Sequence, residues 1–177
     1  IKEMGIEAIR NNQTHYSPSA GLMPLREAIA NHVGQTRRTR VDPEEVVVTP
    51  GGKPIMFHSI LATVNPGDEV IYPNPGYPIY ESVVRFIGAK PVPLSLDEER
   101  GFSFDADELR AKVGPKTAMI ILNSPHNPTG GIFRQSDLEA VAEMALRHDC
   151  WVLSDEIYSR IVFDGEVYSI SSLPDMK

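Results

Sequence analysis

Short apolar runs of strand length alternate with segments of helical period through most of this 177-residue sequence. Most of the runs contain several consecutive apolar residues instead of apolar residues at every second position, which is typical of parallel strands buried on both faces. They lie at residues 46–48, 69–72, 89–96, 117–122 and 150–154. The alternation therefore predicts an α/β fold, a three-layer α/β/α arrangement in which helices cover both faces of a mostly parallel sheet.

Helix signals occupy the segments between the runs. Asp105 and Glu108 have the spacing of a capping box, and so do Ser136 and Glu139. Pro24 suits the first turn of a helix, because its missing N–H would have no partner there. Helices are expected at residues 1–10, 24–33, 52–64, 78–87, 105–114 and from residue 136 onward.

The length and composition fit one domain with a sizeable core. We expect that domain over residues 1–177, with N-terminal helices at about 1–40 and the alternating core at about 45–160. The opening IKEMGIEAIR has no initiator Met and resembles a helix cut partway, so the chain is expected to be a fragment of a longer protein.

The charge pattern disfavours a nucleic-acid partner. The net charge is −7, and no basic run is longer than the short cluster of Arg37, Arg38 and Arg40. Binding a polyanion needs a basic face, which this composition does not favour. No apolar run approaches the roughly 18 residues of a membrane-spanning helix. We therefore expect neither a nucleic acid nor a membrane among the partners.

The numbers and positions of the cysteines and histidines argue against disulfides and metal sites. Cys150 is the single cysteine, so no disulfide can form within the chain, and a reducing, cytoplasmic location is expected. The five histidines show no spacing typical of metal ligands, and no cysteine pair accompanies them. No metal site is predicted.

The residues that directly follow the strands are the candidates for binding, because ligands of such sheets bind at the carboxyl ends of the strands. After the first run come Gly51, Gly52 and Lys53, which open a helix. Free N–H groups at a helix start favour phosphate, although a plain tight turn has the same composition. After the second run comes Tyr77, which could stack on a flat ligand or simply cover the edge of the sheet.

Two further strand ends carry polar side chains. The stretch NSPHNPTGG places the amide of Asn127 after the fourth run, although Asn-Pro is also a common way to start a turn. The stretch SDEIY places Asp155 and Tyr158 after the fifth run, three residues apart, so that one helical turn would bring them to the same ligand. The neighbouring Glu156 is interpreted as a solvated or helix-start acid. Together the four strand ends suit a flat, phosphorylated, cationic heteroaromatic ring.

At this point the sequence resembles the class I/II aminotransferases of fold type I, which use pyridoxal 5′-phosphate. The resemblance covers nearly the whole chain and implies the large domain of that family. It rests on five segments in the family's order: YSPSAGLMPLREAIA, VVVTPGGK, DEVIYPNPGYPIY, ILNSPHNPTGG and VLSDEIY. The combination of HNPTGG and SDEIY is the most specific part.

The resemblance implies a role for each candidate. Asp155 is similar to the carboxylate that pairs with the pyridinium nitrogen, where charge pairing keeps the ring protonated. Tyr158 and Asn127 resemble the pair that hydrogen-bonds the ring's phenolic oxygen, and Asn127 is also expected at the substrate carboxylate. Tyr77 resembles the stacking residue. The phosphate loop is expected at Gly51, Gly52 and Lys53, without the small hydroxyl residue that relatives often place there.

The family's pattern also implies partners and missing parts. Tyr16 is similar to a tyrosine that reaches the phosphate from a second subunit, which implies a homodimer with shared sites. The Schiff-base lysine lies well after the aspartate motif in this family, and Lys177, in SSLPDMK, has neither that context nor that separation. The small C-terminal domain and the substrate-binding arginine have no counterpart either.

These comparisons lead to one expectation with two alternatives. The parent protein is expected to transfer an amino group between an amino acid and a 2-oxo acid, and the chain by itself is expected to be inactive. A pyridoxal-phosphate-dependent lyase or synthase of the same fold would share every motif named here. A module of this fold without catalysis, serving binding or dimerisation, would lack the lysine as this chain does.

Overall fold

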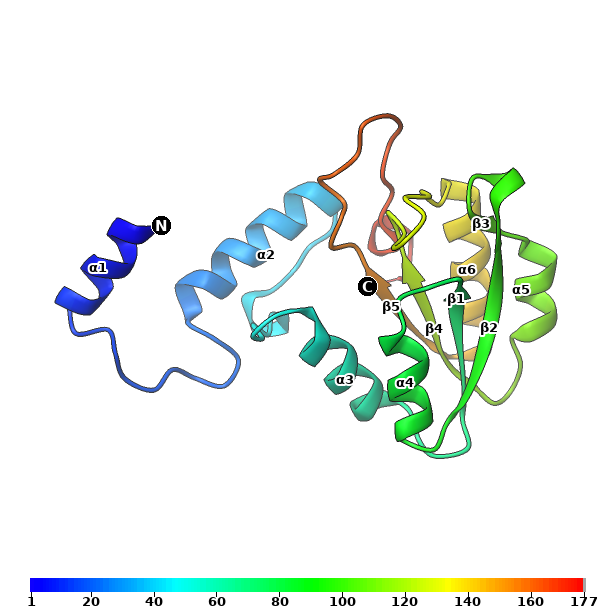
Figure 1. Ribbon diagram of the computed structural model, residues 1–177, viewed down its shortest axis with the longest axis horizontal. Helices are drawn as coiled ribbons and strands as arrows, with labels where there is room; N and C mark the ends of the chain where they lie inside the picture. Colours follow the sequence, from blue (N-terminus) through cyan, green and yellow to red (C-terminus); the bar gives the residue numbers. More distant parts are fainter. Residues whose placement is uncertain (177) are drawn as a thin grey trace. The chain divides into compact units, whose positions relative to one another are not determined.

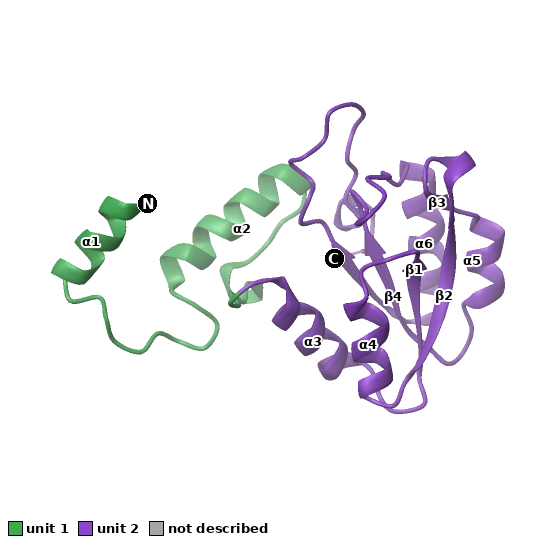
Figure 2. Cartoon of the chain, viewed as in Figure 1, with its two compact units in different colours: residues 1–50 green, residues 51–177 purple. Residues whose placement is uncertain are grey.

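The computed structural model describes residues 1–176 and divides the chain into two compact units, residues 1–50 and residues 51–177 (Figure 2). The first unit contains α1 (Lys2–Arg10), α2 (Met23–Arg37) and the 3-10 turn η1 (Pro43–Glu45). Both predicted helices are confirmed, and Pro24 lies in the first turn of α2. Whether the two units together form one large domain stays a prediction.

Arg26 organises the second half of the first unit. Its side chain is buried, and Nε donates to the backbone carbonyls of Pro43 at 3.0 Å and Val46 at 2.9 Å. A terminal nitrogen pairs with Glu44 at 2.9 Å. These bonds tie α2 to the turn η1 and to the extended segment that follows it.

The predicted strand at residues 46–48 is wrong. The segment is extended, but the part of the chain that the structure describes pairs it with no neighbouring strand. The N–H of Val48 donates to the carbonyl of Ala20 at 2.9 Å, and the Val47 side chain is exposed. Three β-branched residues favour an extended backbone, but only a partner strand turns that preference into a ladder.

The second unit is built on one five-stranded sheet in the order β3-β2-β1-β4-β5 (Figure 1). The strands are β1 (Glu69–Asn74), β2 (Lys90–Asp97), β3 (Ser103–Phe104), β4 (Thr117–Asn123) and β5 (Trp151–Asp155). All pairs are parallel except β2 with β3. The other four predicted strands are confirmed, whereas β3 is too short to leave a periodic signal in the sequence.

Helices cover both faces of this sheet, as predicted (Figure 1). One face packs against α3 and α4 through Met56, Ile60 and Val84, and the other packs against α5 and α6 through Leu109 and Val141. The bounds are α3 (Gly52–Thr63), α4 (Ile79–Phe86), α5 (Ala106–Lys112) and α6 (Gln135–His148), with the 3-10 turns η2 (Glu98–Arg100) and η3 (Ile170–Ser172). Among residues 1–176, none of the helices has the length and apolar character needed to cross a bilayer.

The caps of α5 and α6 differ from the predicted capping boxes. Asp105 accepts from the N–H of Asp107 at 2.8 Å, as an N-cap should, but Glu108 pairs with Lys112 and Ser95 instead of reaching back. Helix α6 begins one residue before Ser136, and its capping acid is Asp137, which accepts from the N–H of Arg134 at 2.8 Å. The capping-box spacing therefore located both helices without identifying every bond.

The strand order creates a crevice between β1 and β4. These two strands are neighbours, yet β1 leads into α4 on one face of the sheet and β4 leads into α6 on the other. Their connecting loops therefore depart in opposite directions at the carboxyl end of the sheet. Such a switch point is where open parallel sheets bind ligands.

Candidate functional site

A cavity of about 530 Å³ lies at the carboxyl ends of β1, β4 and β5, a volume within the usual range for a ligand site. We call it the strand-end cavity. It brings together most of the residues predicted from the sequence: Gly52, Lys53, Tyr77, Asn127, Asp155 and Tyr158. Gly51 is the N-cap of α3 and directly precedes Gly52. Tyr16 belongs to the first unit, where its side chain is fully exposed.

The amino end of α3 forms one wall and offers an anion site. Gly51 has a φ of +96°, a conformation that side chains disfavour, and none of the described side chains makes a cap hydrogen bond to the helix. A Cβ at Gly51 or Gly52 would meet no atom within 4 Å, so the space in front of the first turn is open. The backbone of the first helical turn, the helix dipole and the nearby Lys53 together favour a phosphate there.

Two tyrosines form the second wall. Tyr77 precedes α4, and its ring packs edge-to-face against Tyr80, with centroids 5.9 Å apart and an interplanar angle of 87°. Tyr80 is fully buried, and its hydroxyl donates to Oδ2 of Asp155 at 2.8 Å. Burial, reinforced by the Asp155 carboxylate, raises the pKa of Tyr80 far above its ordinary value, so the phenol stays a neutral donor.

Asn127 is held in place by a side chain that sequence reasoning missed. The buried Asn123 accepts the N–H of Asn127 at 2.8 Å through Oδ1 and donates to the carbonyl of Asp155 at 3.0 Å through Nδ2. One amide therefore fixes two strand-end loops to each other. A polar residue that ends an otherwise apolar buried strand was the available signal.

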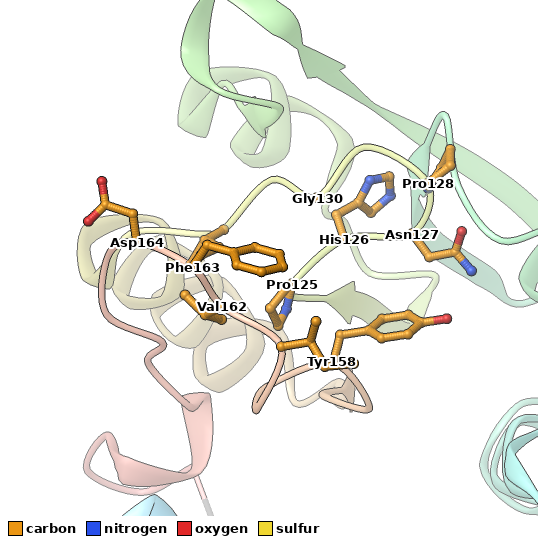
Figure 3. Close-up of a pocket in the computed structure, with 11 residues that line it drawn as sticks. Pro125, His126, Asn127, Pro128, Gly130, Tyr158, Val162, Phe163 and Asp164 are labelled. Carbon is orange, nitrogen blue, oxygen red and sulfur yellow. The ribbon is translucent and has the colours of Figure 1, made fainter.

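Asp155 is the last residue of β5, and Tyr158 lies in the turn that follows the strand. The N–H of Ile157 donates to Oδ1 of Asp155 at 3.3 Å, and the N–H of Ile161 donates to the carbonyl of Tyr158 at 2.8 Å. Figure 3 shows the side-chain ends of Tyr158 and Asn127 extending to the same side of their loops. The strand end and its turn thus present a carboxylate and a phenol to one cavity.

Glu156 is neither the solvated acid nor the helix-start acid that was expected. It is half-buried, and its Oε1 accepts from the hydroxyls of Ser154 at 3.0 Å and Ser169 at 2.7 Å. These bonds attach the segment before η3 to the end of β5. Glu156 therefore anchors the turn that follows Asp155 and carries Tyr158.

A second cavity, of about 420 Å³, lies behind the same two side chains (Figure 3). Asn127 and Tyr158 line both cavities, and Ile161, Val162 and Phe163 supply apolar walls to the second one. Asn127 and Tyr158 therefore form part of the partition between the two spaces, with the charged and hydrogen-bonding groups concentrated on the strand-end side.

His126 braces the loop that carries Asn127. The ring is buried, Nδ1 lies 2.8 Å from Oγ1 of Thr129, and Nε2 makes no hydrogen bond among residues 1–176 that meets normal geometry. Burial lowers the pKa of His126, and the carbonyl of Pro75 opposes this effect more weakly. The folded protein therefore keeps this histidine neutral where an exposed one takes up a proton.

A pH dependence of stability follows from this shift. Below about pH 6.5 the unfolded chain binds a proton that His126 resists in the folded state, so the free energy of unfolding should fall as the pH falls, by about 1.4 kcal/mol per unit of lowered pKa. His126→Asn should flatten the profile between pH 7.5 and 5, measured by urea unfolding. The exposed His32, changed to Asn, is the control. Equal profiles for wild type and His126→Asn would contradict the assignment.

Comparison with known proteins places this chain in a family. Residues 1–176 match the family Aminotransferase class I and II. A probable aspartate/prephenate aminotransferase from Thermus aquaticus is 40% identical over 98% of this chain and 45% of its own length. An arginine–pyruvate transaminase from Pseudomonas aeruginosa is 40% identical over 99% of this chain and 45% of its own length.

The solved structures agree. An aromatic aminotransferase from Pyrococcus horikoshii superimposes with a TM-score of 0.94 at 38% identity, over 99% of this chain and 48% of that one. The chain belongs to the class I and II aminotransferases and has their fold type I architecture. It spans about 45% of the length of the curated relatives it matches.

Proposed function

We propose that the strand-end cavity binds pyridoxal 5′-phosphate and that the whole protein transfers an amino group between an amino acid and a 2-oxo acid. The observation that carries this proposal is the convergence, around one cavity, of an open helix start, an aromatic ring, an amide and a hydrogen-bonded carboxylate. The relatives' names refer to amino-group transfer, which favours this activity over a lyase or synthase.

Each wall would hold a different part of the cofactor. The glycine loop at Gly51 and Gly52, with Lys53, would bind the phosphate at the start of α3. Tyr77 would stack on the ring, and the amide of Asn127 would hydrogen-bond an oxygen substituent of the ring. When bound, the cofactor supplies an electron-accepting ring that stabilises negative charge on the substrate carbon.

Asp155 and Tyr158 are the residues we propose to be catalytic. A carboxylate at the ring nitrogen keeps that nitrogen protonated, which increases the electron demand of the ring. The Tyr158 phenol would hydrogen-bond the same ring oxygen as Asn127. The pairing of Asp155 with a buried donor supports this role, because an oriented carboxylate loses little entropy when the ligand arrives.

Several parts of the proposal lie beyond these residues. Asn127 would also contact the substrate carboxylate, and Tyr16 would reach the phosphate of a second copy, making the protein a homodimer with shared sites. Activity would also need a Schiff-base lysine at a position that no lysine of this chain matches; Lys177 lies outside the described residues. The single cysteine supports a cytoplasmic location.

Binding of pyridoxamine 5′-phosphate tests the proposal, because this ligand has the ring and phosphate but no aldehyde to react with a lysine. The dissociation constant is compared with those of pyridoxamine, which lacks the phosphate, and of an analogue with CH in place of the ring nitrogen. We expect each change to weaken binding by about tenfold or more, the typical loss for a charge-assisted hydrogen bond. Equal affinities for all three would contradict the proposal.

Reduction with borohydride after incubation with pyridoxal phosphate addresses the lysine. Peptide mass mapping should find no stable phosphopyridoxyl group on the chain, since no lysine matches the family's position. A stoichiometric label on Lys53, which lines the cavity, or on Lys177 would show that the chain supplies its own covalent attachment point.

A further inference from the structure

Tyr80 connects two site residues that come from different strand ends. Its hydroxyl donates to Oδ2 of Asp155 at 2.8 Å, and its ring packs edge-to-face against Tyr77. The residue is fully buried, although its side chain forms part of the cavity wall. Seventy-five positions separate Tyr80 from Asp155 along the chain, so only the fold brings them together.

The hydrogen bond limits how Asp155 can turn. Oδ2 accepts from the Tyr80 hydroxyl, and Oδ1 accepts the longer and weaker bond from the N–H of Ile157 at 3.3 Å. A strong donor on one oxygen fixes the plane of the carboxylate and leaves the other oxygen as the better acceptor for an incoming cation. Burial and the carboxylate raise the pKa of the Tyr80 phenol, so the hydroxyl remains a donor at neutral pH.

The same ring supports the stacking surface. Tyr77 and Tyr80 pack edge-to-face. Because the positive edge of one aromatic ring attracts the negative face of the other, this packing fixes the plane of the Tyr77 ring. α4 carries Tyr80 at its start, and its core contacts make that position rigid. The buried side chain of Tyr80 therefore sets the orientation of both the Asp155 carboxylate and the Tyr77 ring.

We propose that Tyr80 is a positioning residue, which orients the Asp155 carboxylate toward the ring nitrogen of a pyridoxal-type ligand and holds Tyr77 parallel to that ring. The inference rests on the proposed function, since it needs a ligand whose ring nitrogen meets Asp155. It adds a residue for which no role was predicted from the sequence, and it assigns the hydroxyl and the ring of Tyr80 separate tasks.

Tyr80→Phe tests the hydroxyl, because it keeps the ring and its packing. The matched control is Tyr72→Phe: Tyr72 is also buried in the same core, and its hydroxyl donates to a carboxylate, Oε2 of Glu81, at 3.0 Å. Both variants lose one hydroxyl that bonds to an acid. Only one of them loses a bond to Asp155.

The readout is a selectivity ratio: the dissociation constant of the analogue with CH in place of the ring nitrogen, divided by that of pyridoxamine 5′-phosphate. We expect Tyr80→Phe to lower this ratio about three- to tenfold, the equivalent of one ordinary hydrogen bond, because Asp155 keeps its charge and loses only the bond that orients it. Tyr72→Phe should leave it unchanged. The ratio between pyridoxamine and its phosphate should be unaffected in both variants, because the phosphate wall is at α3.

The outcomes separate the two proposals. If the wild-type protein does not distinguish the two rings, the role proposed for Asp155 fails, and the role of Tyr80 fails with it. If the wild type discriminates and Tyr80→Phe discriminates equally well, only the inference about Tyr80 is overturned. Equal losses in both variants would also overturn it. Tyr80→Met gives a second hydroxyl-free variant with an adaptable side chain, should Tyr80→Phe fail to fold.

Discussion

Replacing Asp155 with asparagine is expected to weaken binding of pyridoxamine 5′-phosphate by about 10- to 100-fold, the equivalent of about 1.5–3 kcal/mol for a hydrogen bond to a charged group. The substitution keeps the shape of the side chain and an oxygen that can accept from Tyr80. It removes the negative charge that would pair with a protonated ring nitrogen. Selectivity over the analogue without this nitrogen should therefore disappear as well.

The neighbouring acid provides the control for Asp155. Glu156 also lines the strand-end cavity and carries the same charge, but its Oε1 is bonded to Ser154 and Ser169. Glu156→Gln changes the local charge by the same amount, and we expect it to weaken binding less than about threefold, because screened charges without direct contact interact weakly. If both variants lost affinity equally, the overall negative charge of the cavity would explain the effect better than a specific ion pair at Asp155.

Asn123→Ala is expected to give the largest loss of stability among the variants considered, about 2–4 kcal/mol in the free energy of unfolding. It removes the bonds to the N–H of Asn127 and the carbonyl of Asp155, both within the closely packed ends of β4 and β5. A buried N–H left without a partner costs more than the bond itself contributes. Urea unfolding followed by circular dichroism measures the loss.

Gln135→Ala removes an amide of comparable chemistry from an exposed position. Its Nε2 donates to Glu139 within α6 at 2.8 Å, where water can replace the bond, so the expected loss is below about 0.5 kcal/mol. An Asn123→Ala variant with stability within 0.5 kcal/mol of that control would show that water, or a shift of the loop, satisfies the released groups. Binding of pyridoxamine 5′-phosphate should also weaken in Asn123→Ala, because Asn127 loses its support.

Most of the fold could be predicted because apolar runs and helix caps act locally. The strands from β1 onward, apart from β3, and all the helices lie close to where the sequence placed them. The exception at residues 46–48 has the opposite cause: a strand is defined by its neighbour, and no local pattern shows whether a neighbour is present. Asp137 was missed as a cap for a related reason, since its second bond comes from Ser103, far away along the chain.

The candidate site divides in the same way. Asn127, Asp155, Tyr77 and Tyr158 stood out because polar or aromatic side chains directly after buried strands have few structural reasons to be there. Asn123 and Tyr80 did not stand out, since a buried side chain inside a strand or helix resembles core. Their roles appear only in the bonds they make to residues on other elements.

By itself, the sequence determined the α/β class, the order of the elements and which strand ends carry chemistry, because periodicity, caps and turns are properties of neighbouring residues. Only the tertiary structure decided that β1 lies beside β4, which opens the crevice, and that Tyr80 and Asn123 support Asp155 across it. The physical reason is that such contacts join residues far apart in the chain, and strand order and close packing select them together.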